Sequence, residues 1–124
     1  MRVFKNKAFS KWAAREGLGD AQLQAAVWEI EDGLLDAELG GNVIKKRIAL
    51  GSRGKSGGVR TLLVYRTQTK AFFVYGFAKN VRANIKQDEL KALKRYASEL
   101  LSYDDNALSK ALKAGELVEV TGNG

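Results

Sequence analysis

Apolar residues in the first third of the chain recur at intervals of three and four, which is the spacing of one helix face. Phe9, Trp12 and Ala13 mark a first helix. A second helix has Asp20 as its N-cap. Its apolar stripe consists of Leu23, Val27, Ile30 and Leu34. Trp28 lies beside that stripe, so we expect its ring in the core rather than on a binding surface.

The middle of the chain has the period of two and the β-branched and aromatic residues typical of strands. Strands are predicted at residues 43–50, 59–66 and 71–78, joined by a glycine-rich loop and a four-residue turn. These short connections indicate an antiparallel meander, because a parallel pair needs a long crossover. Residues 2–5 are predicted to add a short strand at an edge of the sheet.

The last third of the chain returns to helical spacing. Asn84 and Gln87 have the spacing of a capping box at its start. A second short helix is predicted at 107–114, and residues 117–120 either form an edge strand or stay irregular. The apolar face of the first of these helices consists of Leu90, Leu93, Ala97 and Leu100. Helices, then a strand meander, then helices make the predicted fold class α+β.

Composition narrows the chemistry that is open to the chain. Its 124 residues suit a single domain spanning 1–124. It has no cysteine and no histidine, so we expect no disulfide, no metal site and no cofactor, and the commonest general base is absent. Residues 1–10 show no signal-peptide pattern and no segment is long and apolar enough to span a membrane. We therefore expect a soluble, cytoplasmic protein.

Charge is distributed unevenly along the sequence. Residues 39–87 contain eleven Lys and Arg and no Asp or Glu, whereas the whole chain has a net charge of +7. The rest of the chain is therefore net acidic. A segment with one sign of charge attracts a polyanion, and nucleic acid is the usual one.

Two catalytic classes find no support in the motifs. Gly54-Lys55-Ser56 looks like the end of a phosphate-binding loop, but Ala49 stands where the first glycine of GxxxxGK[ST] belongs. A strand also follows that motif, where the phosphate loop needs a helix. The adjacent acids Glu31-Asp32 and Asp104-Asp105 suit a solvated helix face and a turn better than an acid–base pair.

The predicted strands instead place cations and aromatic rings together. Lys45 and Arg47 share one face of their strand, and Lys46 lies on the other. Arg60 and Arg66 share a face of the next strand. In the third strand we expect Phe73, Tyr75 and Phe77 to share a face. A merely solvated face mixes both signs of charge, so the pattern favours binding to a nucleic acid.

These residues resemble the RelE/HigB group of bacterial toxins, the toxin halves of type II toxin–antitoxin pairs. The resemblance lies in Lys45-Lys46-Arg47-Ile48-Ala49, in a GKSGGxR motif at residues 54–60 and in a YGFAKN motif at residues 75–80. It implies a small antiparallel sheet with the helices packed on one face and a basic face left open. It also implies a compact core of about residues 1–100, and it gives residues 102–124 no role.

The resemblance further implies an activity and partners. RelE-type toxins are mostly ribonucleases that cut messenger RNA on the ribosome, with a cognate antitoxin, here expected to be of helix-turn-helix type. The RNA 2′-hydroxyl attacks the adjacent phosphate without a metal. Arg60, Lys55, Lys79 and Tyr75 match the catalytic positions, and the RNA phosphates would lie on Lys45, Arg47, Arg53 and Arg82. Several relatives carry an arginine where this chain has Asn80, and Arg82 is its nearest replacement.

Two other functions stay open at this point. ParE-like toxins inhibit DNA gyrase on the same fold, and fold alone does not settle function. A non-catalytic RNA-binding module would use the same cations only to bind. The GKSGGxR motif and the lysine after the last strand favour the ribonuclease branch.

Overall fold

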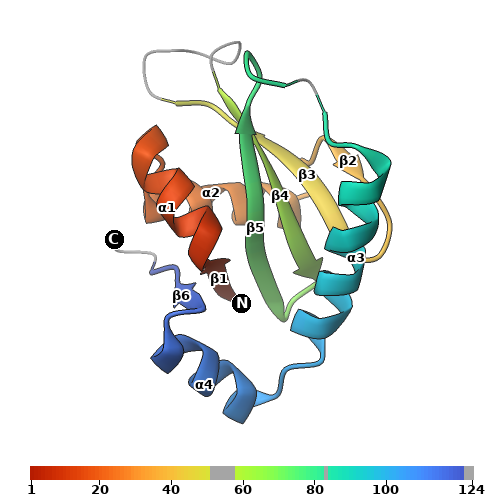
Figure 1. Ribbon diagram of the computed structural model, residues 1–124. Coiled ribbons are helices and arrows are strands. Elements are labelled where there is room, and N and C mark those ends of the chain that lie inside the picture. Colours follow the sequence, from red (N-terminus) through yellow and green to blue (C-terminus); the bar gives the residue numbers. More distant parts are fainter. Residues whose placement is uncertain (51–57, 83, 122–124) are drawn as a thin grey trace.

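The computed structural model describes residues 1–50, 58–82 and 84–121. They form one six-stranded sheet of order β2-β3-β4-β5-β1-β6 with helices packed around it (Figure 1). The strands are β1 (Arg2–Asn6), β2 (Ala37–Glu38), β3 (Val43–Ile48), β4 (Val59–Arg66), β5 (Lys70–Ala78) and β6 (Leu117–Glu119). The helices are α1 (Lys7–Glu16), α2 (Asp20–Glu31), α3 (Gln87–Leu101) and α4 (Asp105–Ala114). The predicted α+β class is confirmed.

The meander β3-β4-β5 is antiparallel as predicted, but β1 is not an edge strand. It pairs in parallel with β5 on one side and antiparallel with β6 on the other. The helices α1 and α2 and the meander separate β1 from β5 in the sequence, which provides the long crossover that a parallel pair needs. The edge strand beside β1 is β6, so residues 117–119 do form the edge strand that the sequence left open.

The helices do not all pack on one face, and the prediction was wrong in this detail. Helices α1 and α2 cover one face of the sheet, in a cluster with Leu63 and Phe73. Helices α3 and α4 cover the other face, in a cluster with Val64 and Phe72. Side chains of consecutive strand residues point to opposite faces, and both Leu63 and Val64 are fully buried. Each face of the central strands is therefore apolar and is packed against its own pair of helices.

Helix α2 differs from the prediction at both ends. Gly19 is its N-cap and Asp20 its first residue. The helix stops at Glu31, so Leu34 lies beyond it and is 59% exposed. Trp28 is 61% exposed rather than in the core. It lies one position, or about 100°, around the helix from the buried Val27, which turns its ring away from the sheet.

The segment after α3 is built into the core on the second face. Leu108 and Ala111 of α4 and Leu117 of β6 are buried in the cluster that contains Phe4 and Phe72. The rings of Phe4 and Phe72 stack at 5.1 Å between centroids. Residues 102–121 thus cover β1, with β6 paired along its free side and α4 packed on the second face.

Gly76 of the YGFAKN motif is required by packing. A Cβ built on it would overlap the ring of Trp12 on α1. We expect Gly76→Ala to reduce the free energy of unfolding by roughly 1–3 kcal/mol, as overpacking does, measured by urea denaturation. In a Trp12→Leu background the same change should cost little, because the ring is gone. An equal cost in both backgrounds would contradict this explanation.

Candidate nucleic-acid interface

The strand register places two arginines directly opposite each other on the α3 face of the sheet. Arg47 of β3 pairs with Arg60 of β4, and Arg60 pairs with Phe77 of β5. Two residues further along, Lys45 lies opposite Leu62 and Leu62 opposite Tyr75. Like charges in directly opposed positions destabilise a sheet. An anion bound between the two guanidinium groups removes that repulsion.

Arg60 has the most distinctive environment of these cations. Its Nη1 atom is buried and has no hydrogen-bond partner among the residues that the structure describes. The residue as a whole is half-buried, so part of its side chain is shielded from solvent. A buried charged donor without an acceptor costs free energy, and a phosphate oxygen is an acceptor of the right charge.

A β-bulge brings Tyr75 to this face. Leu62 pairs with Tyr75 and Leu63 with Phe73, so β5 carries one extra residue, Val74, between them. Phe73 consequently packs on the opposite face against Phe9, 5.3 Å between centroids. The prediction that Phe73, Tyr75 and Phe77 share a face was therefore wrong for Phe73. Tyr75 and Phe77 do share the Arg60 face, with ring centroids 6.1 Å apart.

Arg82 is tied to Tyr75 and to α3 in this structure. Its Nη1 donates to the Tyr75 hydroxyl at 3.0 Å, and Nη1 and Nη2 donate to the two Glu89 carboxylate oxygens at 3.1 and 2.6 Å. Hydrogen bonds from Arg82, and then from the Lys86 backbone, lower the pKa of Glu89 to about 2. The same pairing raises the pKa of Arg82, so both groups are ionised throughout the physiological pH range.

Lys79 follows β5 directly, and its side chain is exposed. It comes two residues after Phe77, which is opposite Arg60, so it lies at the same end of the sheet. Lys55 and Arg53, the other predicted site cations of this region, lie outside the described residues. The strand register places four of the predicted site residues on one face of the sheet, namely Lys45, Arg47, Arg60 and Tyr75. Arg82 contacts Tyr75, and Lys79 lies at the same end of the sheet.

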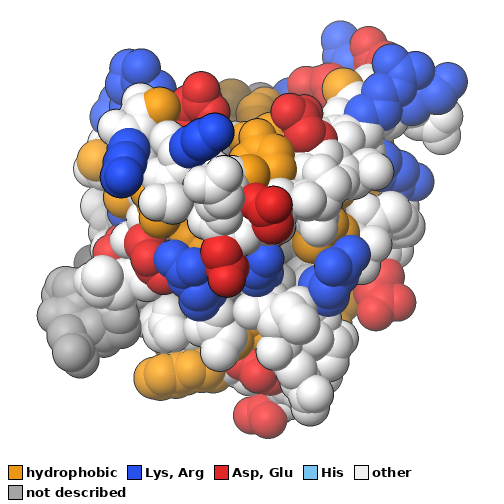
Figure 2. All heavy atoms as spheres, turned by 90° about the horizontal axis from the view of Figure 1, so that it is seen from below, with side chains coloured by type: hydrophobic (Ala, Val, Ile, Leu, Met, Phe, Trp, Pro, Cys, Tyr) orange, Lys and Arg blue, Asp and Glu red, His pale blue; other side chains and the backbone are white. Residues whose placement is uncertain are grey.

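The opposite end of the molecule looks different. Figure 2 views it from the end where α4 lies, and there Lys and Arg are interspersed with Asp and Glu. Such a mixed surface is typical of a solvated face. The paired arginines lie instead near the strand ends at the top of Figure 1, where Ile48, Val59 and Ala78 are in register.

A family model described as "RelE toxin of RelE / RelB toxin-antitoxin system" matches residues 1–120. This chain belongs to the RelE toxin family. No curated protein matches it. As a RelE-type toxin it is one half of a toxin–antitoxin system, and an antitoxin is its partner. In the described part of the chain no helix is both long and apolar enough to cross a bilayer.

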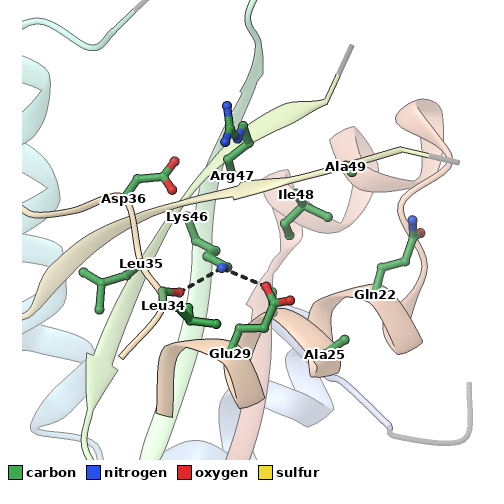
Figure 3. Close-up of a pocket in the computed structure, with 11 residues that line it drawn as sticks. Gln22, Ala25, Glu29, Leu34, Leu35, Asp36, Lys46, Arg47, Ile48 and Ala49 are labelled. Carbon is green, nitrogen blue, oxygen red and sulfur yellow. Dashed lines mark hydrogen bonds and ion pairs between the residues drawn. The ribbon is translucent and has the colours of Figure 1, made fainter. Parts of the chain in front are cut away.

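Not every cation of this RelE chain belongs to the interface. Lys46 points to the other face of β3, where its Nζ lies 2.8 Å from Glu29 and donates to the Leu34 carbonyl at 2.8 Å. Figure 3 shows it in the pocket between α2 and β3, with Arg47 directed to the opposite side of the strand. Its side chain is only 9% exposed. Lys46 therefore anchors the segment after α2 and is not part of the cationic face that carries Arg47 and Arg60.

Glu89 is the site residue that sequence reasoning missed. The predicted capping box at Asn84 and Gln87 is wrong: Lys86 is the N-cap, and the Glu89 carboxylate accepts from its backbone N–H at 2.8 Å. One signal for it was available. Asp88 and Glu89 are the first acids after the acid-free segment, so they are the nearest acids along the chain to Lys79 and Arg82.

Proposed function

We propose that this RelE-family toxin is a ribosome-dependent endoribonuclease that cuts messenger RNA and so inhibits translation. One observation carries the proposal: Arg60 lies opposite Arg47 and has a buried donor without a partner among the described residues. A fixed cation of this kind suits a reaction in which negative charge develops on a phosphate. An exposed cation that changes its partners freely would contribute to RNA binding but not to the rate of cleavage.

The reaction needs no metal. The 2′-oxygen of the RNA attacks the adjacent phosphorus, and the bond from phosphorus to the 5′-oxygen of the next nucleotide breaks. The products are a 2′,3′-cyclic phosphate and a free 5′-hydroxyl. The planar fork of Arg60 holds the non-bridging oxygens as their charge increases. Lys55 and Lys79 are proposed to take the 2′-hydroxyl proton and to protonate the leaving oxygen.

The remaining residues of the face hold the RNA strand. Lys45, Arg47 and Arg53 are proposed to bind phosphates on either side of the cut, and Tyr75 to stack on a base. The ring of Tyr75 is already fixed by Phe77 and by the hydrogen bond from Arg82. A fixed ring loses little conformational entropy when a base stacks on it.

Expression of the toxin without antitoxin should stop growth and cut only messages that are being translated. The experiment compares two reporter messages that differ only in the start codon, so that one is translated and the other is not. Primer extension locates the cuts. The untranslated message should stay intact. Equal cutting of both messages would overturn ribosome dependence. Broken DNA with intact messages would support gyrase inhibition. RNA binding without any cleavage would support a non-catalytic RNA-binding module.

A further inference from the structure

The donors of Arg82 are almost all in use. A guanidinium has five N–H groups. The Nε of Arg82 donates to the Asn84 carbonyl at 2.9 Å, and the two Nη atoms make the three contacts with Tyr75 and Glu89 described above. Among the described residues this leaves a single N–H on Nη2. In this arrangement Arg82 cannot grip a phosphate with two parallel hydrogen bonds.

The Glu89 carboxylate occupies the place that such a phosphate would take. Carboxylate and phosphate both bind arginine in the same bidentate geometry, so Glu89 marks an anion site of the right shape. The site adjoins the cationic face: Tyr75, which contacts Arg82, is paired with Leu62. Leu62 is two residues from Arg60 along β4, or about 7 Å. The Arg82 guanidinium also lies over the ring of Phe77, with its Cζ 5.8 Å from the ring centroid, and Phe77 is the strand partner of Arg60.

The contact between Arg82 and Glu89 can be reached from solvent. The two side chains are 25% and 37% exposed, so an RNA phosphate can approach Arg82 and compete with the carboxylate for its donors. The Glu89 carboxylate keeps its hydrogen bond to the Lys86 backbone at the start of α3 when it releases Arg82. Exchange of one anion for another therefore leaves the helix start intact.

We propose that Glu89 occupies the phosphate-binding position of Arg82 in the free toxin, and that an RNA phosphate displaces it from there, beside the Tyr75 hydroxyl. The inference rests on the proposed function, since it takes RNA to be the ligand. Glu89 acts as a positioning residue. In the free toxin it holds Arg82 beside Tyr75, and when RNA binds it releases Arg82 to the RNA phosphate.

Removing the charge of Glu89 should strengthen RNA binding through Arg82. The probe is a fluorescent single-stranded RNA with 2′-O-methyl groups, which binds but cannot undergo attack by its 2′-oxygen. In the wild type the Glu89 carboxylate that Arg82 gives up retains the cation that leaves the RNA phosphate, so the exchange releases no salt ion in net. In Glu89→Gln it releases one, so the slope of log affinity against log salt should steepen by about 0.7, with roughly threefold tighter binding at low salt.

Three variants make the test decisive. Glu99→Gln on the exposed side of α3 removes the same charge away from Arg82 and should leave the slope unchanged. Arg82→Ala should abolish the effect, so that Arg82→Ala/Glu89→Gln binds like Arg82→Ala. Circular dichroism checks that each variant is folded. If Glu89→Gln binds like the wild type or more weakly, or if Glu99→Gln matches it, the subsite is wrong and the pair is only a clamp for Tyr75.

The measurement separates this inference from the proposed nuclease function. The probe is neither cleaved nor presented on a ribosome, so a steeper slope for Glu89→Gln supports the subsite whether or not the toxin proves to be a nuclease. Absence of any binding to the probe by both proteins overturns the subsite. Cleavage on ribosomes then still tests the function.

Discussion

Arg60→Ala is expected to slow single-turnover cleavage on saturating ribosomes by about 10²–10³-fold, the usual cost of losing one donor that stabilises transition-state charge. Affinity for RNA should change much less, because one phosphate contact among several alters the salt slope by only about 0.7. Arg60→Lys should recover little activity, since lysine keeps the charge but loses the planar fork. Cleavage and equilibrium binding are measured on the same preparations.

Arg66→Ala is the matched control for this experiment. Arg66 lies on the same strand as Arg60 but at its far end, opposite Lys70, and is exposed. Its loss should leave the cleavage rate nearly unchanged. If Arg60→Ala and Arg66→Ala reduce cleavage equally, or if Arg60→Ala loses affinity and no catalytic rate, Arg60 is not the catalytic cation.

Deleting residues 102–124 is expected to unfold the protein. The deletion removes Leu108 and Leu117 from the cluster around Phe4, together with the pairing of β6 to β1. Each buried leucine lost costs about 2–5 kcal/mol, and a domain of this size has only about 5–15 kcal/mol in total. Urea unfolding followed by circular dichroism should show no cooperative transition for the truncated chain.

Single substitutions in α4 measure how much its buried side contributes to the free energy of unfolding. Leu108→Ala should reduce the free energy of unfolding by about 2–5 kcal/mol. Lys110→Ala, on the exposed side of α4, should stay within about 0.5 kcal/mol of the wild type. A truncated protein with a wild-type unfolding midpoint would show that α4 and β6 are dispensable for the core.

Local patterns predicted the meander well, because each of its strands carries its own signal. The predicted 59–66 matches β4 residue for residue, and the other two strands differ by one or two residues at an end. The position of β1 had no such signal, since parallel pairing with β5 depends on contacts far apart in the sequence. The sequence does contain a signal that helices pack on both faces of the sheet. It has a continuous apolar run of Leu62, Leu63 and Val64, which is typical of a strand buried on both sides.

The candidate site was predictable where strand alternation is regular. Arg60 and Arg47 follow from the period of two, and the structure places them opposite each other. Tyr75 reaches their face only through the bulge at Val74, which breaks that period and has no marker in the sequence. Glu89 belongs to a different element, so only the docking of α3 brings it to Arg82.

The most direct test of the central claim compares one messenger RNA in two states. Purified toxin is mixed with the message either naked or bound in programmed ribosomes, and cleavage is followed in a single turnover. We expect wild-type toxin to cut the ribosome-bound message within the decoding site and to leave the naked message intact, and Arg60→Ala to cut the ribosome-bound message about 10²–10³-fold more slowly. Equal cleavage of the two forms, or cleavage by Arg60→Ala at the wild-type rate, would contradict the account.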